Sequence, residues 1–155
     1  MIACISGEKL PYLGSELELA VGGRGRIRKV GERLYLPEGT TPEQLAGWVK
    51  QQAKPYLTWH LESEAAKHGF AYASLRISHA TGRWGSCSED RRINLSWHLM
   101  LCPPECIRYV IIHELCHLLH MDHSRAFWYE VELRDPDFRE HKRWLDEHGS
   151  FMDLL

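Results

Sequence analysis

One stretch of eleven residues, His113 to His123, constrains this chain more than any other. It reads HELCHLLHMDH and holds four histidines, a glutamate and an aspartate. The four residues before it, YVII, are apolar, so the stretch is expected to begin inside a buried helix. A polar group without a partner costs about 1–3 kcal/mol in a protein interior. The histidines of such a helix therefore need a partner.

His113 and His117 have the spacing of a metal-ligand pair. Residues four apart lie on one face of a helix, so both imidazoles can hold one ion at the roughly 2.0–2.1 Å of zinc–imidazole bonds. Glu114 points about 100° away from His113 and can reach a water bound to the same metal. This is the arrangement of an H-E-x-x-H motif. The sequence predicts one zinc ion (Zn2+), with Glu114 as the base that takes the proton of the attacking water.

A catalytic zinc site usually has three protein ligands and one position open for water. His123 reaches the open side of the ion if the chain turns after the helix, which is expected to run to about His120. The His120 side chain lies too far along the helix axis to be a ligand, and is expected to support a ligand or to lie on the surface. The alternative third ligands, on the next helix, are Glu130 and Glu132.

The rest of the pattern predicts a single α+β domain over residues 1–155. Short strands are expected within 12–36, and a helix over about 42–68 that begins with a capping box at Thr41 and bends or breaks at Pro55. A sheet and the catalytic helices follow over 74–149: a hairpin of SLRIS and RINLSW, the HELCH helix from Pro104, a helix capped by Asp122 or Ser124, and a helix from Asp135-Pro136 to about Gly149.

Composition excludes several classes of protein. The formal net charge of −2 gives no general attraction for nucleic acid, and the arginines of residues 22–29 are read as a solvated hairpin, so no nucleic-acid partner is expected. No apolar run approaches the roughly 20 residues of a membrane span, and the N-terminus lacks a secretory pattern. Five cysteines without framework spacing indicate reduced thiols, so the expected location is cytoplasmic.

Two motifs carry a family resemblance, RWGSCS at 83–88 and HELCHLLHMDHSRAFW at 113–128. Together with the INLSW and YVIIHEL segments they resemble the YgjP-like family of predicted zinc metallopeptidases, which is distantly related to SprT-like proteases. The resemblance extends from residue 12 to residue 149. It implies a zincin-like domain with a small antiparallel sheet and a central HExxH helix, zinc on His113, His117 and His123, and Glu114 as the catalytic glutamate.

The RWGSCS motif has two interpretations. As structure, Gly82 and Gly85 make a tight connection and Trp84 packs on the core. As function, Arg83 or Ser86 lies near the zinc and contacts the substrate or the charge that develops in the transition state. Family likeness also suggests that the strand RINLSW is the edge against which an extended peptide pairs.

Water activation at such a site predicts a hydrolase, and the favoured reaction is cleavage of a peptide bond in a peptide or protein substrate. Two alternatives stay open. One is a zinc hydrolase of a non-peptide bond, such as an amide or a nucleotide phosphoanhydride, because the motif activates water and does not itself recognise peptides. The other is a catalytically idle interaction domain that the metal stabilises.

Overall fold

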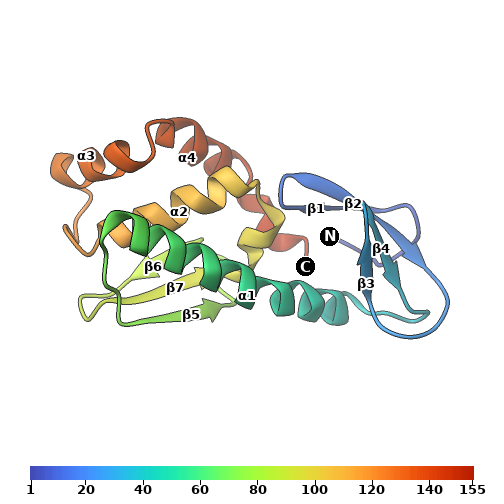
Figure 1. Cartoon of the computed structure of the whole chain (residues 1–155). Helices are drawn as coiled ribbons and strands as arrows, with labels where there is room; N and C mark the ends of the chain where they lie inside the picture. The colour runs from blue at the N-terminus through green and yellow to red at the C-terminus, as the bar shows by residue number, and fades with distance from the viewer.

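Helix α1, which spans Pro42–His68, runs between two small sheets in the computed structural model, which describes residues 1–155 (Figure 1). It begins as predicted with a capping box: the Thr41 hydroxyl accepts from the Gln44 amide, and the Gln44 side chain accepts from the Thr41 amide at 2.9 Å. It ends at Gly69, whose φ of 71° suits a residue without a Cβ. The helix continues through Pro55, so the break considered there is absent.

The first sheet lies at the N-terminal end of α1 and has the strand order β1-β2-β4-β3 (Figure 1). Its central pair, β2 and β4, is parallel, and the two outer pairings are antiparallel. The inward side chains, among them Leu17, Leu19 and Leu34, are almost fully buried. The strands are β1 (Lys9–Tyr12), β2 (Ser15–Val21), β3 (Arg28–Val30) and β4 (Arg33–Leu36).

The second sheet lies beside the C-terminal half of α1 and has the order β5-β7-β6, with β5 (Ser74–Ser78), β6 (Gly85–Cys87) and β7 (Arg92–Ser96). β5 and β7 are parallel, and β6 and β7 are antiparallel. The predicted hairpin of SLRIS and RINLSW is therefore wrong, and both sheets are mixed where an antiparallel sheet was expected. The physical reason is β6: it forms the antiparallel hairpin with β7, so β7 runs in the same direction as β5 and pairs with it in parallel on its other side.

This order also corrects the expected position of the sheet edge. The RINLS part of this segment forms β7, the central strand, and its two sides are already paired with β5 and β6. It has no free edge for a peptide. The open edges of this sheet belong to β5 and β6.

Five helical segments follow the second sheet. The 3₁₀ helix η1 leads into α2, the HELCH helix. Helix α2 ends at Cys116, earlier than predicted, because the next turn has the tighter i→i+3 hydrogen bonds of a 3₁₀ helix, such as Leu118 N–H to Leu115 O. Ser124 caps α3 as predicted. α4 starts later than predicted, at Phe138. The segments are η1 (Trp97–Leu101), α2 (Pro104–Cys116), α3 (Arg125–Arg134), α4 (Phe138–Glu147) and η2 (Gly149–Asp153).

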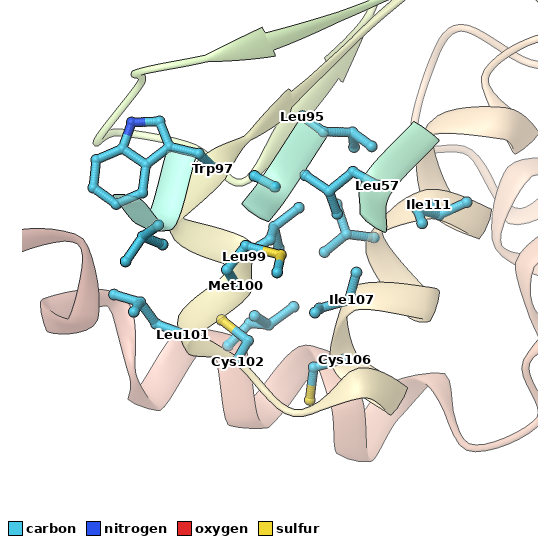
Figure 2. Close-up of a cluster of buried hydrophobic side chains, with 14 of the residues drawn as sticks. Leu57, Leu95, Trp97, Leu99, Met100, Leu101, Cys102, Cys106, Ile107 and Ile111 are labelled. Carbon is cyan, nitrogen blue, oxygen red and sulfur yellow. The ribbon is translucent and has the colours of Figure 1, made fainter. Parts of the chain in front are cut away.

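Helix α2 is at the centre of the C-terminal part and packs against α1, α3, α4 and β6. Figure 2 shows Ile107 and Ile111 of α2 in one cluster of buried side chains with Leu57 of α1, Leu95 of β7 and Leu99 of η1. All five side chains are at most 1% exposed. The α+β class with the HExxH helix at its centre is confirmed, and burial on this scale fixes the position of α2. None of the helices combines the length and apolar composition needed to cross a lipid bilayer.

Candidate metal centre

Three imidazoles gather where α2 ends. His113 lies in the last turn of α2, His117 follows its last residue, and His123 lies in the loop before α3. Their nitrogen donors lie within 4.8 Å of one another, and the Nε2 atoms of His113 and His123 are 3.3 Å apart. Two nitrogens bound tetrahedrally to one zinc ion at about 2.05 Å would be separated by about 3.3 Å. The cluster therefore fits a metal ion.

The other ring nitrogens of two of these histidines have partners of their own. The Nδ1 of His117 donates to the carbonyl oxygen of His120 at 2.9 Å, and the Nδ1 of His113 lies 3.2 Å from the Tyr109 hydroxyl. A carbonyl only accepts, so His117 carries its proton on Nδ1 and its Nε2 lone pair is free. Such outer hydrogen bonds orient the rings of metal-binding histidines.

Two aromatic side chains of α3 pack against the cluster. The ring of Phe127 stacks on His117 with a centroid distance of 4.3 Å, and the ring of Trp128 stacks on His123 at 6.0 Å. Burial, followed by the neighbouring histidines, lowers the pKa of His113 to about 3. Its imidazole is therefore neutral at physiological pH, which is the form that binds a metal.

Glu114 lies beside the cluster with its side chain almost fully buried. The residue is 6% exposed, and its carboxyl group takes part in no hydrogen bond or ion pair within the protein, although its backbone carbonyl accepts from the His117 N–H. Burial raises the pKa of Glu114 to about 8, and the positive charge of Arg83 opposes this rise. Below this pKa the carboxyl group keeps its proton, and a cation bound by the neighbouring imidazoles would lower the pKa and favour the carboxylate, the form that accepts a proton.

A cleft opens over His113 and Glu114. Its floor is α2, one wall is the start of β6, and the other wall is α4. Arg83 lines this cleft, whereas Ser86 does not: the Ser86 hydroxyl accepts a hydrogen bond from the Asn94 amide at 3.1 Å. The lining residues are Arg83, Trp84, Gly85, Tyr109, Val110, His113, Glu114, Lys142, Leu145 and Asp146.

Gly85 brings the β6 wall close to Glu114. A Cβ at Gly85 would lie 3.2 Å from both Cγ and Oε2 of Glu114 and 3.1 Å from the carbonyl oxygen of Asn94. A Cβ at Gly82, in the same RWGSCS region, would meet nothing within 4 Å. Close packing therefore requires a glycine at position 85 and not at position 82. The side chain packed against Gly85 is Glu114, the candidate base.

The outer edge of β6 is open beside the cleft. Trp84 and Ser96 lie opposite each other, one position before the pair of Gly85 and Leu95. The Ser96 N–H donates to the Trp84 carbonyl oxygen, so this pair is of the hydrogen-bonded kind. Hydrogen-bonded and non-bonded pairs alternate along an antiparallel ladder. The pairs that Gly85 and Cys87 form with β7 are therefore non-bonded, and the backbone N–H and C=O groups of these two residues point away from β7.

The two glutamates considered as alternative third ligands lie outside the cluster. The carboxylate of Glu130 pairs with Arg134 at 2.7 Å, and that of Glu132 pairs with Arg139 at 3.5 Å. Neither belongs to the group of donor atoms that could hold a metal ion, which consists of His113, His117 and His123.

Sequence reasoning missed Tyr109 and the α4 wall of the cleft. Tyr109 precedes His113 by four residues, so helical spacing alone could have placed its hydroxyl beside that ring. Lys142 and Asp146, which pair at 3.0 Å, offered no such signal, because packing of α4 on α2 brings them to the site from a distant segment.

The fold and this cluster define a class: an α+β domain with three histidines arranged for a metal ion next to a buried glutamate. The chain belongs to the YgjP-like family, since the family's domain, described as "YgjP-like, metallopeptidase domain", matches residues 2–148. The match covers nearly the whole chain and includes every residue of the cleft and the cluster.

The other two comparisons are negative. Neither the curated proteins nor the solved structures include a significant match to this chain.

Proposed function

We propose that this protein is a zinc-dependent metallopeptidase, in which His113, His117 and His123 hold one zinc ion and Glu114 transfers the protons of the reaction. The observation that carries the proposal is the position of the buried Glu114 next to a histidine cluster with the 3.3 Å nitrogen spacing. Membership of a metallopeptidase family supports the same reading.

The donor set favours zinc. Imidazole nitrogens suit zinc among the common metals, and three ligands with a fourth position open are typical of catalytic zinc sites. Zinc in such a site supplies Lewis-acid catalysis: it polarises a carbonyl group and makes water a nucleophile at neutral pH.

Glu114 supplies the proton transfers. Its carboxylate accepts a proton from the water that attacks the substrate carbonyl, and then delivers this proton to the nitrogen of the leaving amine. The cleft allows this because Glu114 lines it and has no protein partner that would hold its oxygens. Gly85 leaves room for this carboxyl group, since a Cβ at that position would lie 3.2 Å from its Oε2 atom.

The open edge of β6 offers a means of binding a peptide. An extended peptide can add to a free strand edge through main-chain hydrogen bonds, whatever its sequence. The outward backbone groups of Gly85 and Cys87 provide that edge, and Gly85 also touches Glu114. A peptide on this edge therefore has its backbone near the candidate base.

The experiment that tests the proposal is digestion of a proteome-derived peptide library, analysed by mass spectrometry. Zinc-loaded wild type is compared with zinc-loaded Glu114→Gln, which has the same shape and cannot accept the proton. We expect cuts by the wild type that disappear in Glu114→Gln, although this variant still binds zinc. His117→Ala should lose both the metal and the cuts.

Two results would reject a peptidase. If wild type with bound zinc makes no Glu114-dependent cut, the bond cleaved is not a peptide bond, and small amides and nucleotides are the next substrates to assay. If Glu114→Gln changes no reaction while zinc still raises the melting temperature, the domain is an idle, metal-stabilised interaction module.

A further inference from the structure

The cleft contains one cation without a partner. Arg83 is exposed, lines the cleft, and forms no hydrogen bond or ion pair within the protein. The other cation of the lining, Lys142, is paired with Asp146 at 3.0 Å, one helical turn away on α4. The guanidinium of Arg83 is therefore free to bind an anionic group of a ligand.

The direction of β6 determines which part of a bound peptide meets Arg83. The strand runs from Gly85 to Cys87, and Arg83 precedes it by two residues. Antiparallel pairing is two to three times as common as parallel pairing in proteins. A peptide antiparallel to β6 runs from Cys87 toward Gly85, so its C-terminal side extends toward Arg83.

Glu114 divides such a peptide into two parts. The contact between Gly85 and Glu114 places the bond to be cleaved near Gly85. The leaving amine, and every residue after it, is then on the Arg83 side of the cleft. A planar guanidinium forms paired hydrogen bonds with a carboxylate, which no neutral group of a peptide reproduces.

We propose that Arg83 selects substrates with a carboxylate on the C-terminal side of the cleaved bond. This inference rests on the proposed peptidase function and specifies its substrate class. The carboxylate has two sources, the free C-terminus of a short peptide or an aspartate or glutamate side chain. The first source would make the protein trim C-termini, and the second would make it cut inside chains before acidic residues.

The test uses peptides built on one cleaved sequence from the library. One arm compares a free C-terminal acid with the C-terminal amide, and the other compares glutamate, glutamine and lysine at the first two positions after the cut. We expect kcat/KM of the wild type to be about tenfold higher for the carboxylate form in at least one arm, since charged hydrogen bonds contribute that much or more. The arm that responds identifies the source.

Variants of Arg83 separate recognition from other roles. Arg83→Glu should reverse the preference, so that the peptide with lysine is cleaved faster than the peptide with glutamate, or the amide faster than the acid. Arg83→Lys should retain part of the wild-type preference. Arg76→Ala, which removes an exposed charge from β5 at the other edge of the sheet, is the matched control and should preserve the selectivity. A uniform loss of kcat over all peptides would overturn the proposal, because it would mean that Arg83 stabilises the transition state instead.

A binding measurement keeps the inference independent of turnover. Fluorescence anisotropy with zinc-loaded Glu114→Gln should show weaker binding of the amide or glutamine peptide than of the carboxylate peptide, and Arg83→Glu added to this variant should abolish the difference. Equal binding of both peptides would overturn the assignment of Arg83 even if peptide cleavage is established. If the library yields no cut, the same acid and amide forms of an unselected library peptide are compared, and carboxylate-dependent binding that Arg83→Glu abolishes would support the anion site at Arg83 while rejecting the peptidase function.

Discussion

The Nε2 atoms of His113 and His123 lie 3.3 Å apart, although one belongs to a helix and the other to the loop that follows it. This proximity depends on the early end of α2 at Cys116, after which tightened turns redirect the chain. His120, within that turn, contributes its carbonyl oxygen to His117 and leaves its own imidazole outside the cluster. A longer helix would carry His123 away from His113.

Replacing His123 by alanine should lower zinc affinity by more than about a hundredfold, because loss of a ligand costs more than the roughly 10–100-fold of a lost outer hydrogen bond. Competition with a chromophoric chelator measures the affinity. His120→Ala is the control: its backbone carbonyl, which holds His117, remains. If His120→Ala weakened binding as much as His123→Ala, the choice of His123 as the ligand would be wrong.

Replacing Tyr109 by phenylalanine should weaken zinc binding by about 10–100-fold, since the ring of His113 loses the hydroxyl that lies 3.2 Å from its Nδ1. Tyr129→Phe, an exposed tyrosine on α3, should bind zinc as the wild type does. The same chelator titration compares the two. An unchanged affinity in Tyr109→Phe would show that His113 keeps its orientation without this contact.

Replacing Gly85 by alanine should reduce peptide cleavage by about tenfold, because the added methyl group displaces the Glu114 carboxyl by a few tenths of an ångström and misplaced catalytic groups lose rate steeply. Gly82→Ala introduces the same methyl group into open space and should keep wild-type kinetics. Thermal melts establish that both variants fold. Full activity in a folded Gly85→Ala would mean that the position of Glu114 tolerates this shift.

His98 makes the stability of the fold sensitive to acid. It is 2% exposed, and burial, then the charge of His79, lowers its pKa below the ordinary 6.5. Below pH 6.5 this histidine binds a proton in the unfolded chain but stays neutral in the folded protein, because its folded pKa is lower. The unfolding free energy therefore falls as the pH falls, with a slope of up to about 1.4 kcal/mol per pH unit from this group.

His98→Gln should therefore lose less unfolding free energy than the wild type between pH 7.5 and pH 5.5. Urea titrations at the two pH values measure this, with EDTA present so that protons do not compete with a metal. The variant is expected to be less stable at pH 7.5, because the buried contact between His98 and Ser96 is disturbed. An equal loss in both proteins would show that His98 does not contribute to the acid sensitivity.

The features that sequence reasoning predicted well are those set by neighbouring residues. Thr41 and Gln44 cap α1 because their side chains reach each other's amides over three residues. His113 and His117 lie close together for the same kind of local reason, and the turn expected after the helix brought His123 into the prediction. The candidate cluster could therefore be assembled from one short stretch.

The features that were missed depend on contacts between distant segments. Strand β6 consists of Gly85, Ser86 and Cys87, which are small and show no alternation, and it exists because β7 pairs with it. Without β6, the parallel pairing of β5 and β7 could not be foreseen. The α4 wall of the cleft likewise follows from the packing of α4 on α2. No local pattern in residues 141–147, HKRWLDE, predicts that packing.

Strand β6 is subject to two opposing demands. An exposed strand edge that receives a peptide also invites another copy of the protein, and proteins limit such self-association with short edges and nearby charges. β6 has only three residues, and the free charge of Arg83 lies at its entrance. Three residues give two copies few main-chain hydrogen bonds with which to pair edge to edge. The shortness and charge of this segment thus help to keep the molecules apart while the edge remains open to smaller chains.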